Sequence, residues 1–182
     1  MHAMTATNLR SAYAGESMAH MRYLIWGDRA EAEGFPNVAR MFRAIAFAEQ
    51  CHATNHFRAL KDEAGPFDVT GGGVFGLTDT SAALQGGIDG ETHEIDEMYP
   101  AYLEIARFQG EKQAEQSFHY ALEAEKIHAE WYAEAKQSVD AGKDIELGTV
   151  RICKVCGHTI EGDAPDFCPI CGAKAEVFVA FE

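Results

Sequence analysis

The sequence lacks the segments that carry a protein into or across a membrane. It contains no run of the roughly 18 apolar residues that a transmembrane helix needs. No basic segment followed by an apolar one lies near Met1, so a secretory signal is not expected. We therefore expect a cytoplasmic protein with no membrane partner.

Positive charge is scarce as well. The chain has 15 lysines and arginines against 29 aspartates and glutamates, which gives a formal net charge of −14. A chain with this balance has no general attraction for nucleic acids, so we expect no nucleic-acid partner. Part of the acidic excess is instead expected inside the protein, as ligands of metal ions.

Cysteine is confined almost entirely to one short segment. Four of the 5 cysteines form two Cys-x-x-Cys-Gly pairs near the C-terminus: Cys153, Cys156, Cys168 and Cys171. Four thiolates at this spacing form a tetrahedral site for iron or zinc, and the pattern favours metal ligation over a disulfide framework. The Cys-Pro-x-Cys-Gly form of the second pair favours rubredoxin-type iron, with a structural zinc ribbon as the alternative.

The sequence does contain a duplicated pattern of glutamate and histidine. A Glu-x-x-His motif occurs twice, and a single glutamate precedes each copy: Glu16 before Glu49 and His52, and Glu91 before Glu125 and His128. Residues three positions apart share a face of a helix, so each motif directs a carboxylate and an imidazole to one point. Two such helices, with one glutamate from each of two more, supply the inward ligands of a di-iron or di-manganese four-helix bundle.

The flanking residues repeat in the same register. Leu9 and Leu84 each lie seven positions before a single glutamate, and Phe42 and Phe118 each lie seven before a Glu-x-x-His motif. The chain therefore reads as two related helical hairpins. The alternative, surface glutamates and histidines on ordinary amphipathic helices, leaves this shared register without an explanation.

The pattern predicts a mainly helical protein with a small C-terminal appendage. Four helices are expected at about 5–34, 36–65, 80–110 and 111–141, with a break or kink at Pro100. The Gly-rich segment 67–77 fits the long crossover of a ferritin-like bundle. The domains expected are the bundle at 1–142, a linker at 143–149 and a four-cysteine domain at 150–182. The last domain is expected to end in a strand near 177–181. It is too small to form a core of its own, so it needs a metal.

A further carboxylate, Glu94, lies three residues after Glu91 on the same helix face. Buried carboxylates normally take up protons unless a cation compensates them, so a metal is the natural partner of this set. Mixed carboxylate and imidazole ligation fits iron or manganese, although ligand type leaves zinc open. Glu94 is either a spare ligand that lets one metal change partners with oxidation state or a solvated charge.

Taken together, these segments resemble a rubrerythrin over essentially the whole chain. The matching segments occur in the family's order: Ala14-Gly15-Glu16-Ser17, Arg22-Tyr23, Ala48-Glu49-Gln50, Gly90-Glu91, Met98-Tyr99-Pro100, Ala124-Glu125-Lys126 and the two Cys-x-x-Cys-Gly pairs. The resemblance implies a ferritin-like di-iron bundle joined to a rubredoxin-like domain. One departure is His158, where family members often carry a tyrosine.

The resemblance also implies the roles of individual residues. The di-iron ligands would be Glu16, Glu49, His52, Glu91, Glu94, Glu125 and His128, and the four cysteines would hold a third iron, or zinc. The two irons would be bridged by an oxide or hydroxide. One iron would exchange His52 for Glu94 on oxidation, and Tyr23 and Tyr99 would hydrogen-bond to ligand carboxylates.

The activity implied by the resemblance is the reduction of hydrogen peroxide to water, in defence against oxidative stress. Electrons would come from a flavoprotein or a small rubredoxin, through the four-cysteine iron, in a head-to-tail homodimer whose subunits feed each other's di-iron sites. The alternatives are a ferritin-like ferroxidase or iron-handling protein, and a di-iron oxygenase. A zinc-ribbon interaction module would account only for the C-terminal segment.

Overall fold

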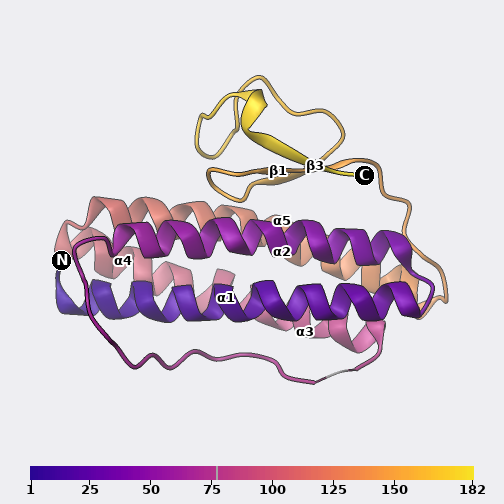
Figure 1. The fold of residues 1–182 in the computed structure, drawn as a ribbon, viewed down its shortest axis with the longest axis horizontal. Coiled ribbons are helices and arrows are strands. Elements are labelled where there is room, and N and C mark those ends of the chain that lie inside the picture. The colour runs from indigo at the N-terminus through magenta and orange to yellow at the C-terminus, as the bar shows by residue number, and fades with distance from the viewer. Residues whose placement is uncertain (77) are drawn as a thin grey trace.

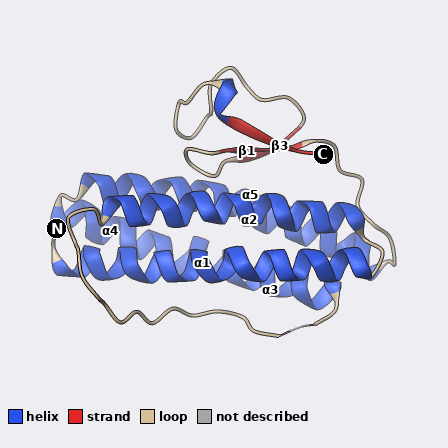
Figure 2. Cartoon of the chain, viewed as in Figure 1, coloured by secondary structure: helices blue, strands red, loops and turns tan. Residues whose placement is uncertain are grey.

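A bundle of long helices carries a small β module on one side in the computed structural model, which describes residues 1–76 and 78–182 (Figure 1). The elements of the bundle, in chain order, are α1 (Ala3–Ala32), α2 (Pro36–Ala59), α3 (Thr80–His93), α4 (Tyr99–Gln109) and α5 (Lys112–Asp140). Figure 2 shows the helical bundle and the separate strands. The mainly helical fold class expected from the sequence is confirmed.

Local signals in the sequence set the helix ends. Gly34, at φ +89°, turns the chain between α1 and α2, and Pro36 occupies the first turn of α2. Asp79 caps α3 by accepting a hydrogen bond of 2.8 Å from the backbone N–H of Ala82. The second helix ends at Ala59 rather than near 65, because residues 60–62 form turns.

The third predicted helix is interrupted, as expected, but the interruption lies before Pro100. A π-helical turn, Glu94–Met98, separates α3 from α4, and Pro100 falls in the first turn of α4. Proline has no N–H to offer the carbonyl of the preceding turn, so regular α-helical bonding is lost there. Such π turns often occur at functional sites, and this one begins at Glu94.

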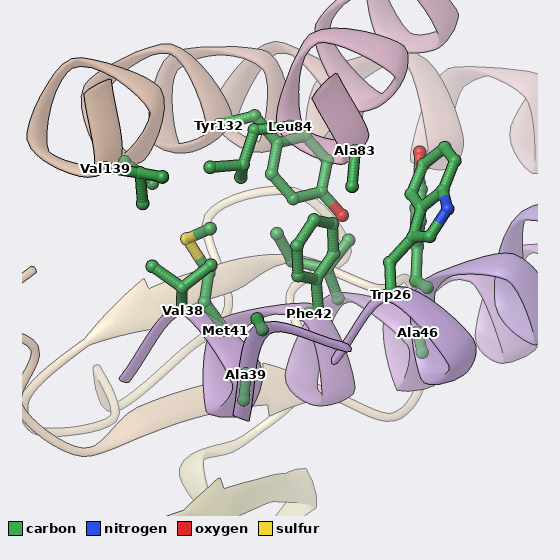
Figure 3. Packing of buried hydrophobic residues seen from close by; sticks show 14 of the residues in the cluster. Trp26, Val38, Ala39, Met41, Phe42, Ala46, Ala83, Leu84, Tyr132 and Val139 are labelled. Carbon is green, nitrogen blue, oxygen red and sulfur yellow. The ribbon is translucent and has the colours of Figure 1, made fainter. Parts of the chain in front are cut away.

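Two apolar clusters fill the two ends of the bundle. In one, Phe42 of α2 packs against Trp26 and Tyr132, with ring centroids 6.1 and 5.2 Å away (Figure 3). The other contains Leu9 and Phe118. Each apolar residue seven positions before a glutamate therefore lies two helical turns away from it. The apolar residues form layers on either side of a layer of glutamates.

The β module packs on the bundle beside α2 and α5 (Figure 1). Its strands β1 (Val150–Cys153), β2 (Thr159–Glu161) and β3 (Phe178–Phe181) form an antiparallel sheet in the order β2-β1-β3. Val150 and Ile152 are buried against Ala44 and Ala48 of α2. The C-terminal strand expected at 177–181 is present from residue 178, after a short 3-10 turn at Ala175–Val177.

The crossover expected at 67–77 connects the two hairpins along one side of the bundle (Figure 2). Gly71 lies so close to α1 that an added Cβ would be 2.9 Å from Cε of Met18. The last residue of the expected crossover, Leu77, lies outside the described residues. Among the helices that the structure describes, none is long and apolar enough to cross a membrane.

Candidate metal centres

Four helices bring the duplicated glutamates and histidines together in the middle of the bundle. Two groups have all their ligand atoms within 4.8 Å of one another: Glu16, Glu49, His52 and Glu125, and Glu49, Glu91, Glu125 and His128. Every member is buried, with at most 2% of its surface exposed. Because Glu49 and Glu125 belong to both groups, they are placed to bridge two metal ions.

The two imidazoles are arranged symmetrically around this shared pair. Nδ1 of His52 lies 2.8 Å from Glu49 Oε2 and 2.9 Å from Glu125 Oε1. Nδ1 of His128 lies 2.6 Å from Glu125 Oε2 and 3.3 Å from Glu49 Oε1. Nδ1 is therefore the ligand atom that each histidine turns toward the carboxylates.

The cluster fits cations because its own hydrogen bonds leave it incomplete. One oxygen each of Glu16, Glu49 and Glu125 is buried without a hydrogen-bond partner, an arrangement that is costly unless a cation binds it. Burial, followed by the charge of Glu125, raises the pKa of both Glu16 and Glu91 well above the usual range. Burial acts on Glu49 too, but His128 and His52 outweigh it and lower the pKa of Glu49 to about 2.

The structure places Glu94 beside these two groups rather than within them. Glu94 is partly exposed at the start of the π turn and lines a cavity of about 350 Å³ with Arg22, Tyr102 and the glycines Gly71 to Gly73. Burial, together with the nearby charge of Glu16, raises the pKa of Glu94. The cavity thus approaches the metal ligands from the side of α1, α3 and the crossover.

Two tyrosines hold the carboxylates at the ends of the cluster. The tyrosine on α1 binds the glutamate on α3, and the tyrosine on α4 binds the glutamate on α1. The hydroxyl of Tyr23 on α1 donates to Glu91 Oε1 at 2.7 Å. The hydroxyl of Tyr99 donates to Glu16 on α1. Both tyrosines are buried, so each keeps a carboxylate oriented toward the centre.

The β module contacts the outer nitrogen of both histidines. Nε2 of His52 lies 3.1 Å from the carbonyl oxygen of Cys156, and Nε2 of His128 lies 2.8 Å from Oγ1 of Thr159. Outer partners of this kind fix the tautomer of a metal-binding imidazole and leave Nδ1 free to bind the metal. No motif in the sequence singles out Thr159, a buried polar residue three positions after the first cysteine pair. His158, the noted departure, is buried and faces the edge of Phe178.

The four cysteines form a second, separate site within the module. Sγ of Cys153 lies 3.6 Å from Sγ of Cys171, and Sγ of Cys156 lies 3.5 Å from Sγ of Cys168. Metal–sulfur bonds of about 2.3 Å in a tetrahedron give edges of about 3.8 Å, so one metal ion fits with little movement. The described residues therefore contain two carboxylate–histidine sites and one four-cysteine site.

Comparison with known proteins agrees with this arrangement. Residues 7–136 match the family model described as Rubrerythrin, and residues 152–179 match the model described as Rubrerythrin, rubredoxin-like domain. Rubrerythrin-2 of Clostridium acetobutylicum is 56% identical over 180 residues, which cover 99% of this chain and 98% of that protein. Nigerythrin of Nitratidesulfovibrio vulgaris is 30% identical, over 97% of this chain and 86% of that protein.

Solved structures show the same fold. The fully reduced, all-ferrous state of nigerythrin superposes with a TM-score of 0.85 at 30% identity, over 97% of this chain and 86% of that one. An open-pore ferritin from Archaeoglobus fulgidus, at 11% identity, has a TM-score of 0.62 over 78% of this chain and 88% of that one. The second likeness extends to the fold alone.

Proposed function

The chain belongs to the rubrerythrin family, and on that premise we propose that it reduces hydrogen peroxide to water with electrons from its four-cysteine centre. The contact between the module and the histidines carries this proposal. Cys156, a ligand of one site, touches the ligand His52 of the other through its carbonyl oxygen. A direct connection between a four-thiolate site and a carboxylate–histidine site suits the transfer of electrons between them.

Iron is the metal proposed for all three sites. The proposed ligands of the paired site are Glu16, Glu49, His52, Glu91, Glu94, Glu125 and His128, and those of the single iron are Cys153, Cys156, Cys168 and Cys171. Two irons held by these residues would supply the two electrons that the reduction of one peroxide needs, which would avoid release of a hydroxyl radical.

The side chains around the metals orient the ligands and keep water out. Tyr23 and Tyr99 hold the end carboxylates, while the apolar layers on either side exclude bulk solvent. The cavity beside Glu94 is the proposed approach for peroxide. Glu94 and His52 are the proposed alternative ligands of one iron.

The proposed partners are an external flavoprotein or rubredoxin as electron donor and a second copy of the chain. In this structure the module docks on its own bundle, and an exchange of modules in a head-to-tail dimer would reproduce the same contacts between subunits. The proposed dimer can be tested by refolding Cys156→Ser together with Glu125→Ala. Exchange predicts that the mixture recovers peroxidase activity, whereas delivery within one chain predicts none.

The proposed activity is tested by the oxidants that the reduced, iron-loaded protein accepts. We expect rapid oxidation by hydrogen peroxide and slower oxidation by oxygen, followed in a stopped-flow spectrometer by the absorption of the four-thiolate iron. Rapid turnover with oxygen and slow reaction with peroxide would refute the peroxidase.

A ferritin-like ferroxidase is the second candidate, since the bundle shares its fold with an archaeal ferritin. It predicts assembly into a cage and an iron content well above the capacity of the three sites. Iron analysis and the mass of the assembly in solution distinguish this candidate from the peroxidase. The four-cysteine module, which a storage protein does not need, favours the peroxidase.

A further inference from the structure

A buried chain of hydrogen bonds leads from Ser117 on α5 to the proposed metal ligand Glu16. Oγ of Ser117 on α5 lies 2.8 Å from Nδ1 of His56, and Nε2 of His56 lies 3.1 Å from the hydroxyl of Tyr99. The Tyr99 hydroxyl donates to Glu16. At most 4% of the surface of any of these residues is exposed, and the proposed function leaves Ser117 and His56 without a role.

The donors along this chain all point toward the metal site. The single hydroxyl proton of Tyr99 goes to Glu16, because a carboxylate that binds metal can only accept. The oxygen of Tyr99 then accepts from Nε2–H of His56, which leaves Nδ1 of a neutral imidazole to accept from Ser117.

The outer end of the chain meets a polar cavity. Ser117 lines a cavity of about 340 Å³ between α2 and α5. Ala59 and Tyr120 also line it, and its remaining lining residues are polar or charged: Asn55, Arg58, Lys61, Gln113 and Gln116. A cavity of this size and polarity admits water. Its lining shares no residue with the cavity beside Glu94, so the two approach the metal site along separate routes.

We infer that Ser117, His56 and Tyr99 form a proton pathway from this cavity to Glu16 at the metal centre. The inference rests on the proposed function, because reduction of one peroxide to two waters consumes two protons along with two electrons. Apart from Glu94, the proposed ligands of the paired site are almost completely buried, so protons bound for Glu16 need a route through the protein.

Each transfer along the pathway conserves atoms and charge. A proton from cavity water joins the oxygen of Ser117 as the original hydroxyl proton passes to Nδ1 of His56. The Nε2–H bond of His56 breaks as its proton passes to Tyr99, and the proton of Tyr99 passes to Glu16. One proton enters and one arrives, and no electron moves. The transfer leaves the ring proton of His56 on Nδ1, so the ring must return to the Nε2–H tautomer, and both hydroxyls must rotate, before the next proton passes.

The direction of the chain is tested by nitrogen NMR on the zinc-loaded protein, which is diamagnetic. We expect the ring of His56 to be protonated at Nε2 and bare at Nδ1, and the Nδ1 resonance to shift in Ser117→Ala. A proton on Nδ1, or a doubly protonated ring, would overturn the pathway. Because this measurement involves no peroxide, it judges the pathway even if the proposed peroxidase fails.

The transfer itself is tested with His56→Gln, which keeps an amide donor for Tyr99 but cannot pass a proton between two nitrogens. We expect the reduced, iron-loaded variant to react with peroxide about 100-fold more slowly, and Ser117→Ala about 10-fold more slowly, with larger solvent deuterium isotope effects. The matched control is Thr54→Ala on the same helix, whose hydroxyl bonds to the carbonyl of Gln50. A wild-type rate in His56→Gln at equal iron content would show that His56 only positions Tyr99.

Discussion

Among single residues, the four buried carboxylates of the metal centre fall into two kinds. Glu49 and Glu125 each reach both imidazoles, whereas Glu16 and Glu91 each belong to one half of the site. The end carboxylates are the ones held by tyrosine hydroxyls. The shared pair therefore joins the two metal positions, and the end pair sets their separate surroundings.

The exchangeable ligand proposed at Glu94 gives the first prediction at this scale. Glu94→Ala should retain most of the bound iron, because two complete ligand groups remain, but it should react with peroxide at least about tenfold more slowly. Stopped-flow oxidation and iron analysis measure both effects. Glu97→Ala on the same π turn is the control, since Glu97 is exposed and forms an ion pair with His93 rather than facing the metal ligands. An unchanged rate in Glu94→Ala would refute the ligand exchange.

His56 shows the limit of sequence reasoning at this scale. His56 is one of the six histidines, of 8 in the sequence, that lie outside the Glu-x-x-His motifs, and nothing in its local sequence indicates a role near the metals. Its importance comes from Ser117 and Tyr99, which lie on other helices and far away in the sequence. No local spacing rule connects such residues.

At the scale of elements, the first cysteine loop is shaped to meet the bundle. Gly157 adopts φ +83°, and an added Cβ would lie only 2.0 Å from Nε2 of His52. Gly172 occupies the equivalent place after the second cysteine pair, at φ +73°, with nothing within 4 Å of its would-be Cβ. The two loops share a backbone conformation, but only the first is pressed against a metal ligand.

This contrast yields a prediction with a built-in control. Gly172→Ala should cost about 1–2 kcal/mol of stability through left-handed strain alone. Gly157→Ala should carry the same strain and also push the module away from His52, which exposes β1 and β2. Hydrogen exchange of residues 150–161, together with thermal unfolding, separates the two effects. Equal exchange in the two variants would mean that the module does not dock through Gly157.

The π turn is another feature decided at the level of elements. Pro100 indicated a break, but the position of that break depends on how α3 and α4 pack against α5 as well as on the proline. The break falls at Glu94–Met98, one turn earlier. Glu94 therefore lies in a π-helical turn, whereas the other proposed ligands of the paired site lie in regular α-helices.

At the scale of the whole molecule, stability should depend on pH in opposite ways with and without metal. In the metal-free chain, burial raises the pKa of Glu16 and Glu91 above the ordinary 4.5. A raised pKa means that their contribution to stability is full below about pH 4.5 and is lost as the pH rises.

His128 acts in the same direction. Burial alone would lower its pKa, but Glu49 and Glu125 raise it to about 10 from the ordinary 6.5, so its stabilising effect is lost between those two values. Glu49 has the opposite effect on stability, because its pKa is lowered to about 2. Its contribution to stability is lost only as the pH falls below about 4.5, so it does not change the trend at higher pH. The metal-free protein should therefore become less stable as the pH rises from about 5 to about 9.

Bound metal should reverse this trend, because cations bind deprotonated ligands and their affinity grows with pH. Calorimetric melting temperatures of the chelator-treated and the zinc-loaded protein, measured from about pH 5 to about pH 9, check the prediction. We expect a falling curve for the metal-free protein and a flat or rising curve for the loaded one. Two parallel curves would contradict it.

Local sequence patterns are enough to predict the candidate ligands and the fold class. Residues three apart on a helix share a face, seven residues span two turns, and paired Cys-x-x-Cys motifs form a four-thiolate site, so Glu49 and His52, or Cys153 and Cys156, follow from local geometry. How these parts meet depends on packing between segments that are distant in the sequence. The contacts of Thr159 with His128 and of Ser117 with His56 join residues 31 and 61 positions apart, because packing rather than sequence spacing brings them together.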